Sequence, residues 1–518
     1  MKTLIKNGSI IDGTGKEAYI GDISFSDGLI TGIGRINEGP DTVIIDAGGK
    51  CVMPGFIDAH RHADLKVFDD DFGQAEIRQG ITGISAGTCG LSAAPCPKDR
   101  KQDLYSFLEP ITGRANIEDD FETFEKYLEA VKKRKPILNF GCFVGNCTVR
   151  IAAKGFETGR ILPWELKKAK YYIEEALCAG AKGLSSGLAY SPEDSYNIDE
   201  MTQLAKVLKK YEVPLVTHMR GEGNSLLSSV AEVIEIAKRA DVPLHISHFK
   251  AAGKNNWKWL IHEAMEIIER ENAAGMDISC DVYPYEAGAT NIIQILPPQW
   301  KSGGAEETIS KLKDPEMRKR LAQDLDREYD DWDNLIYSTG WGSVMISSVT
   351  LEKNRKYIGS DIQSICEQEG VSPVEFISDL IVEEKGRVGK IFFHMDMEDV
   401  REVIKWKYSM IASDSLYPSR GLAHPRVYGT YPRMLAGFVR DEKLLSLPEA
   451  VFKMSGAPAA RFGFEKRGVL KKGNIADIVI IDLDRLVDIS DYIDPVNYSP
   501  GIMKVFSQGM EIYYEGMK

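Results

Sequence analysis

Two histidines one residue apart, His60 and His62, follow an apolar run in the segment PGFIDAHRHAD. Side chains alternate with period two along a strand, so both imidazoles lie on one face of an extended chain and can hold one metal ion. Such a His-x-His pair also occurs by chance near ordinary strand ends and is a weak signal when it stands alone. Whether this pair binds metal therefore depends on further metal-binding side chains elsewhere in the chain.

Further metal-binding side chains stand where other apolar, β-branched runs end. The chain has eight histidines, and four of them fall at such ends together with a cysteine and an aspartate: His60, His62, Cys89, His218, His248 and Asp414. Imidazole, thiolate and carboxylate donors together favour zinc, and a site with open positions is the catalytic kind. We therefore predict a catalytic metal site at these strand ends.

Two choices within this set depend on local context. In HISH, His245 and His248 are three residues apart and point to opposite faces of a strand. We expect His248 at the mouth and His245 packed or hydrogen-bonded outside the site. Cys89 ends the second candidate strand, whereas Cys96 lies in a Pro-flanked loop. We favour Cys89 as a ligand, although a buried free cysteine that only packs is the alternative.

The elements that carry these residues alternate between short apolar runs and amphipathic helical stretches. This alternation is typical of βαβ units, and eight candidate strands predict an α/β fold, a (β/α)8 barrel over residues 54–464. The gap from Tyr283 to Asp414 is much longer than the others and predicts an inserted subdomain at about 288–350, before the last strand. Residues 1–53 and 465–518 instead resemble strands joined by Gly-centred turns, including a hairpin at Asp27-Gly28, and predict one β domain built from both ends.

Composition narrows the class of protein. The 518 residues are 43% hydrophobic and 27% charged, with a formal net charge of −13. The acidic balance argues against a nucleic-acid partner, and no apolar window reaches the length of a membrane span. The start lacks the apolar core of a signal peptide, and the eight cysteines are scattered. We expect a cytoplasmic enzyme acting on a small molecule, with its oligomeric state open.

Several longer motifs resemble one family along nearly the whole chain. They are PGFIDAHRH, GTCGLSAAP, GLSSGLAYSP, VTHMRGE, ISHFKAAGKNNW, DVYPYEAGAT, ASDS and HPRVYGTYPRML. With them the chain resembles the amidohydrolase superfamily, and within it the N-acyl-D-amino-acid deacylases, or D-aminoacylases. The resemblance implies a TIM barrel, a β-sandwich formed by both termini, and zinc-dependent hydrolysis of N-acyl-D-amino acids to a carboxylic acid and a free D-amino acid. The preference for D-substrates rests on the resemblance alone.

The resemblance also implies roles for individual residues. Cys89, His218 and His248 would surround one tightly held zinc ion, with His60 and His62 near a second, weaker position. Asp414 would be the catalytic carboxylate. Lys250, Tyr283 and Arg426 match positions that bind the substrate carboxylate, for which the guanidinium of Arg426 offers a bidentate fork. A structural ion pair is the alternative for Arg426.

Two other functions stay open. A cyclic-amide hydrolase of the hydantoinase or dihydropyrimidinase type uses the same barrel with a carboxylated lysine, for which Lys182 is the candidate. A metal-free binding or scaffold protein is the other. The segment SDSLYPSRGLAHPR departs from the family pattern, which leaves the side-chain preference open. In this segment, Arg420 weakly indicates a substrate with an anionic side chain. A surface arginine without a role in binding is at least as good an explanation.

Overall fold

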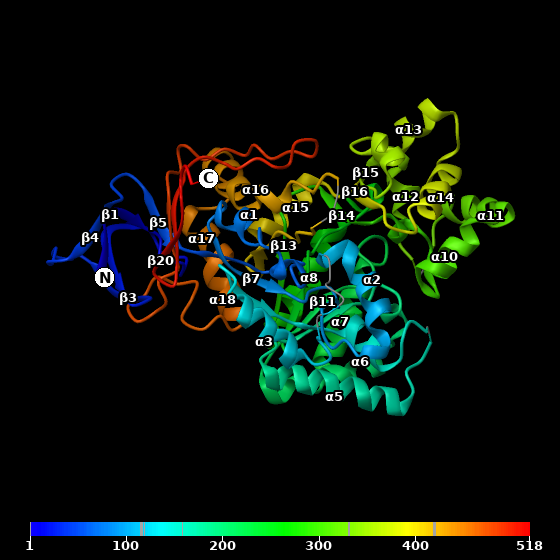
Figure 1. Ribbon diagram of the computed structural model, residues 1–518, viewed down its shortest axis with the longest axis horizontal. Coiled ribbons are helices and arrows are strands. Elements are labelled where there is room, and N and C mark those ends of the chain that lie inside the picture. Colours follow the sequence, from blue (N-terminus) through cyan, green and yellow to red (C-terminus); the bar gives the residue numbers. More distant parts are fainter. Residues whose placement is uncertain are drawn as a thin grey trace.

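The structure is a computed structural model that describes residues 2–113, 118, 120–157, 159–329, 332–417 and 421–517. Arg420 lies outside these residues. Parallel strands with helices around them form the middle of the molecule (Figure 1). This confirms the predicted α/β fold with a parallel sheet. The strands are β6 (Phe56–Asp58), β7 (Ile81–Ala86), β8 (Asn139–Cys142), β9 (Val144–Gly145), β10 (Leu184–Gly187), β11 (Leu215–His218), β12 (Leu244–Ile246), β13 (Ile278–Val282) and β17 (Ser409–Ile411).

The parallel strands pair in sequence order and return to the first one. β6, β7 and β8 form one sheet, and β9 to β13 followed by β17 form another. Phe143 alone separates β8 from β9, and a parallel bridge joins Arg61 to Ser415 just after β6 and β17. At the same seam, the backbone N–H of Asp414 donates to the His60 carbonyl over 2.9 Å. The carboxyl ends of these strands therefore meet at one mouth.

Amphipathic helices follow most of these strands, and α6 shows how the sequence sets a helix start. The Asn197 side chain accepts the N–H of Glu200 at 2.9 Å, and the Glu200 carboxylate accepts the N–H of Asn197 at 3.2 Å. This capping box satisfies two backbone donors.

Among the described residues, no helix is both long and apolar enough to cross a bilayer. The helices are α1 (Gln74–Ile77), α2 (Lys101–Thr112), α3 (Phe124–Arg134), α4 (Asn146–Ala153), α5 (Pro163–Ala179), α6 (Ile198–Ala205), α7 (Leu226–Ala240), α8 (Leu260–Ala273), α15 (Met397–Lys405), α16 (Arg426–Arg433), α17 (Leu447–Val451) and α18 (Ala457–Arg461).

One mixed sheet combines strands from both ends of the chain, seen as blue and red strands together in Figure 1. Its order is β20-β19-β18-β5-β1-β2-β3, with β4 paired to β1. β5 and β18 join the two ends as antiparallel neighbours. The strands are β1 (Lys2–Ile10), β2 (Tyr19–Ser26), β3 (Leu29–Gly34), β4 (Thr42–Asp46), β5 (Cys51–Pro54), β18 (Ile478–Ile481), β19 (Ile502–Ser507) and β20 (Met510–Tyr514). The domain bounds 1–53 plus 465–518 and 54–464 stay a prediction.

The hairpin predicted at Asp27-Gly28 is confirmed. β2 and β3 pair as antiparallel strands, with Ser26 opposite Leu29. Asp27 and Gly28 have φ angles of 51° and 78°. A two-residue turn of this type needs positive φ at both central positions, which an Asp-Gly pair adopts readily.

A separate segment between β13 and β17 has its own core and extends to the right of the parallel strands in Figure 1. Its buried apolar side chains run from Ile292 to Phe392. The segment is longer than the predicted 288–350, because the central strand of its antiparallel sheet, β16, comes last in the sequence. We call residues 287–393 the insert. Its elements are β14 (Ala287–Asn291), α9 (Pro298–Lys301), α10 (Gly304–Leu312), α11 (Pro315–Leu325), α12 (Leu335–Thr339), β15 (Val344–Ser348), α13 (Ile362–Glu369), α14 (Pro373–Glu383) and β16 (Gly389–Phe393).

Candidate metal centre and active site

The six predicted metal-site side chains meet at the mouth of the parallel strands. Their donor atoms form overlapping groups in which every atom lies within 4.8 Å of the others. Cys89 Sγ lies 3.3 Å from His60 Nε2 and 3.4 Å from His248 Nε2. Asp414 Oδ1 lies 3.3 Å from the Nε2 atoms of both His60 and His62. Nitrogen, sulfur and carboxylate oxygen so close together fit a bound metal ion.

Backbone geometry turns three of these side chains into the mouth. Cys89, His248 and Asp414 follow β7, β12 and β17, and their φ angles are 54°, 37° and 48°. The left-handed conformation costs a non-glycine residue about 1–3 kcal/mol and persists only where the surroundings impose it. Here the N–H of His248 donates to Asp281 Oδ1 at 2.7 Å, and that of Asp414 donates to the His60 carbonyl. The site thus stores backbone strain in order to aim its side chains.

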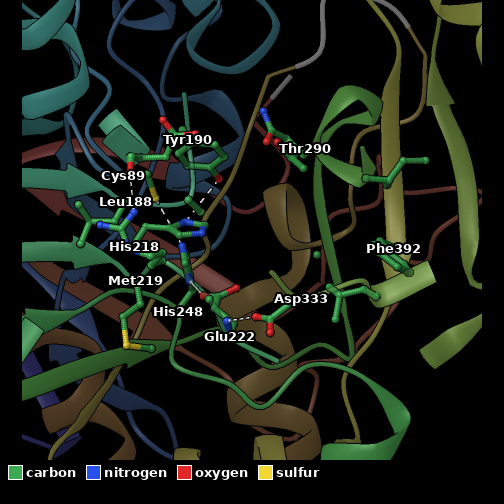
Figure 2. Close-up of a pocket in the computed structure, with 18 of the residues that line it drawn as sticks. Cys89, Leu188, Tyr190, His218, Met219, Glu222, His248, Thr290, Asp333 and Phe392 are labelled. Carbon is green, nitrogen blue, oxygen red and sulfur yellow. Dashed lines mark hydrogen bonds and ion pairs between the residues drawn. The ribbon is translucent and has the colours of Figure 1, made fainter. Parts of the chain in front are cut away.

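Glu222 joins the cluster and was missed by the sequence analysis. It forms a third close group with His218 and His248, and its Oε1 lies 2.8 Å from His248 Nδ1. His248 Nε2 faces Cys89, and His248 Nδ1 lies 2.8 Å from both Glu222 Oε1 and Lys250 Nζ, so both ring nitrogens have partners. Figure 2 shows Glu222 directly below His218 and His248, with Asp333 beside it. Asp333, from the insert, accepts the backbone N–H groups of Glu222 and Gly223 at 2.8 and 2.7 Å.

Asp281, near the end of β13, is a second carboxylate that the sequence analysis missed. Its Oδ2 accepts from His245 Nε2 at 2.8 Å and lies 3.3 Å from His60 Nδ1. Burial raises the pKa of Asp281, but the charge of His60 and the hydrogen bond from His245 outweigh burial and hold the pKa below its usual range. His245 also bonds Ser279 Oγ at 2.8 Å, so it lies outside the ligand cluster, as expected. Asp281 therefore orients His60 and the backbone of His248.

We expect Asp281→Asn to weaken metal binding about 10- to 100-fold, because loss of a carboxylate that orients a ligand costs that much affinity. Asparagine has nearly the same size as aspartate, but only its amide oxygen accepts hydrogen bonds, whereas both Oδ1 and Oδ2 of Asp281 do so. The metal dissociation constant, measured by competition with a chromogenic chelator, checks this. Asp399→Asn is the control, since Asp399 is a buried carboxylate away from the metal cluster that accepts the backbone N–H of Lys258. Equal affinities for both variants would contradict the orienting role.

Charge is concentrated at the cluster. Burial raises the pKa of Cys89, but His60 and His248 outweigh burial and hold the pKa well below its usual range, which favours the thiolate. Burial likewise raises the pKa of Asp414, and Arg426 and His60 overcome it, so the carboxyl is ionised. A thiolate is the form of cysteine that binds metal.

Of the three predicted substrate-binding residues, Lys250 and Tyr283 line the cavity and Arg426 lies behind it. Lys250 Nζ lies 2.6 Å from Glu222 Oε1. The guanidinium of Arg426 is fully buried, 2.9 Å from Asp414 Oδ2 and 4.7 Å from the centre of the Tyr283 ring. In this structure the ion pair considered as an alternative for Arg426 is therefore present, with Asp414 as its partner.

The cavity over the cluster has a volume of about 570 Å³. One wall carries the metal-site residues together with Tyr190, whose hydroxyl lies 3.4 Å from His218 Nδ1. Side chains of the insert form the opposite wall, and Figure 2 shows Thr290 and Phe392 across the space from His218 and His248. A volume of this size suits a small molecule.

Lys182 lies away from the mouth. It comes two residues before the first residue of β10, and its Nζ donates to the Gly463 carbonyl at 2.9 Å. Its ammonium also lies 5.6 Å from the centre of the Phe464 ring. A lysine that bridges two metals has to reach the carboxyl ends of the strands, so these contacts count against Lys182 in that role.

Comparison with known proteins gives relatives that extend over nearly the whole chain. No protein-family model matches. The chain is 29% identical over 512 residues to the D-aminoacylase of Alcaligenes xylosoxydans xylosoxydans, covering 99% of this chain and 94% of that protein. It is 29% identical over 510 residues to the N-acyl-D-glutamate deacylase of the same organism, covering 98% and 93%. A solved structure of N-acyl-D-glutamate deacylase from Bordetella bronchiseptica, in complex with zinc and a phosphonate inhibitor, is 28% identical with a TM-score of 0.84 and covers 99% and 96%.

The fold, the donor cluster and these similarities define a metal-dependent amidohydrolase. More narrowly, the chain is similar to D-aminoacylases and N-acyl-D-glutamate deacylases over nearly its whole length. This confirms the resemblance predicted from the sequence motifs.

Proposed function

We propose that the protein hydrolyses the amide bond of N-acyl-D-amino acids and releases a carboxylic acid and a free D-amino acid. The observation that carries the proposal is the buried cluster of imidazole, thiolate and carboxylate groups beside the Lys250 ammonium, inside one cavity. Metal ligands next to a fixed cation suit a linear amide that bears a free carboxylate. Similarity to proteins named D-aminoacylase and N-acyl-D-glutamate deacylase supports the same reaction.

The proposed cofactor is zinc. Cys89, His218 and His248 would hold one ion tightly, and His60 and His62 would hold a second, weaker one. His60 lies as near Cys89 as His248 does, so the two positions adjoin. A bound zinc ion supplies water activation and carbonyl polarisation.

Asp414 is the proposed proton carrier. Its Oδ2 is held by Arg426, whereas Oδ1 faces His60 and His62, so Oδ1 is the oxygen that can take a proton from water. The same oxygen would then return the proton to the departing nitrogen. Lys250 and Tyr283 would bind the α-carboxylate, with Arg426 behind them adding its charge.

The test is amine release from matched N-acetyl-D- and N-acetyl-L-amino acids by protein reconstituted with zinc. We expect hydrolysis of the D-forms only, because the proposal is for a D-specific deacylase. Apoprotein prepared with a chelator is the control and should be inactive until zinc is restored. No turnover of either enantiomer, with hydrolysis of hydantoins or dihydropyrimidines instead, would replace the proposal with the cyclic-amide alternative. The contacts of Lys182 with Gly463 and Phe464 count against that alternative.

Domain division and location are part of the proposal. We assign residues 54–464 to the catalytic barrel and residues 1–53 with 465–518 to a β-sandwich domain. We also propose a cytoplasmic protein without nucleic-acid or membrane partners. All eight cysteines lie in the described residues and are unpaired, which suits a reducing compartment.

A further inference from the structure

Two lysines from the insert line the cavity on the side away from the metal cluster. Lys301 is the last residue of α9, and Lys390 is the second residue of β16. Their side chains face the same 570 Å³ space as Cys89, His218 and Asp414. The two residues are only 8% and 6% exposed. Buried lysines are rare unless an opposite charge lies beside them, so these two lysines indicate an anionic partner.

Neither ammonium has a carboxylate partner among the described residues. Lys301 Nζ donates to the amide oxygen of Gln294 at 3.2 Å. Lys390 Nζ makes no hydrogen bond within the described part of the chain and lies 4.4 Å from the centre of the Phe392 ring. Asp194 also lines the cavity and its charge favours the ammonium of Lys301, but the two form no ion pair. Lys250, by contrast, is paired with Glu222 in the same cavity.

The protein therefore bears an electrostatic cost at this wall. Burial lowers the pKa of Lys301 to about 8. Burial and the charge of Lys301 lower the pKa of Lys390 to about 7. An anion held between the two ammonium groups would reverse both effects, because an opposite charge favours the charged form.

The two lysines adjoin the residues proposed for the α-carboxylate. His394, which also lines the cavity, has a pKa lowered to about 3, first by burial and then by the charges of Lys250 and Lys390. Neutral His394 therefore lies near both Lys250 and Lys390. It also lies near Tyr283, because a Cβ added to Gly288 would lie 2.9 Å from the His394 ring and 3.2 Å from the Tyr283 hydroxyl. His394 therefore lies between Lys390 and the residues proposed to bind the α-carboxylate, Lys250 and Tyr283.

We propose that Lys301 and Lys390 form a subsite for a second carboxylate of the substrate, carried by the side chain of an acidic D-amino acid. This inference rests on the proposed deacylase function and narrows its substrate class to N-acyl-D-glutamate and N-acyl-D-aspartate. A carboxylate on the acyl group has the same chemistry and is the other source that the test has to separate.

Three substrates separate the sources: N-acetyl-D-glutamate, its neutral isostere N-acetyl-D-glutamine, and N-succinyl-D-glutamine, whose extra carboxylate lies on the acyl group. We expect the zinc-loaded wild type to prefer N-acetyl-D-glutamate over N-acetyl-D-glutamine by about 10- to 100-fold in kcat/KM, the usual effect of a charged hydrogen bond. Lys301→Met and Lys390→Met should each lower this ratio about tenfold, mainly through KM. Lys390→Arg should keep most of the preference, since it keeps the charge.

Lys353→Met is the matched control, because Lys353 is an exposed lysine of the insert, paired with Glu383. It should leave the ratio unchanged, and melting temperatures should show that all variants fold. A ratio that is the same in the wild type and both Met variants overturns the subsite. Loss confined to N-succinyl-D-glutamine overturns the assignment to the amino-acid side chain. Failure of the wild type on all three substrates overturns the subsite, and failure on every N-acetyl-D-amino acid overturns the proposed function as well.

Discussion

Replacement of Asp414 by asparagine is expected to lower kcat about 10²- to 10⁴-fold, the usual contribution of a positioned acid–base group. Asparagine has nearly the same shape but cannot take a proton from water. It also leaves the buried Arg426 without its ion-pair partner, so KM is expected to change as well. Steady-state kinetics with an N-acetyl-D-amino acid, together with zinc content per chain, measures the effect.

Asp488→Asn is the control for this variant. Asp488 forms an ion pair of 2.9 Å with Arg433, away from the metal cluster. It therefore matches the loss of an Asp–Arg pair without touching the site, and its kcat should stay close to wild type. If Asp414→Asn retained wild-type kcat with full zinc content, Asp414 could not be the proton carrier.

Cys89→Ala should release metal and abolish activity. The thiolate lies within 3.4 Å of two imidazole nitrogens, and its loss removes the sulfur donor from the cluster. Loss of a residue that only orients a ligand lowers metal affinity about 10- to 100-fold. We expect the loss of the Cys89 ligand to lower zinc affinity by more than this. Zinc per chain after gel filtration, measured by mass spectrometry, gives a readout that does not depend on substrate.

Cys96→Ala serves as the paired control. Cys96 is buried in the loop after Cys89, and it packs in the main hydrophobic core. Its removal should change stability more than zinc content. Retention of one zinc per chain by Cys89→Ala would show that the histidines and Asp414 suffice, and would remove Cys89 from the ligand set.

Strand ends were the part of the site that the sequence could predict. His60, His62, Cys89, His218 and His248 each end or follow an apolar run, and parallel strands bring such ends to one mouth. The structure brings their donor atoms together, while their roles as ligands stay predictions. Asp281 carried a readable signal, a carboxylate inside the apolar run ISCDV, which the sequence analysis overlooked.

Long-range contacts were not predictable. Glu222 reaches the cluster because its loop is held by Asp333, 111 positions later in the chain. The left-handed backbones of His248 and Asp414 are held by tertiary hydrogen bonds rather than by local propensity. The end of the insert was missed for a similar reason, because its sheet is completed by β16, a strand that follows two further helices.

The sheet shared by both ends of the chain has a consequence for biosynthesis. Lys50 forms an ion pair with Asp482, a partner 432 positions away, and β5 pairs with β18 in the same region. On the ribosome, β5 is translated early and must wait for almost the entire chain before its neighbour emerges. Its edge stays open during that time, and open strand edges are sites of aggregation. The rate of translation and the presence of chaperones should therefore influence the yield of folded protein.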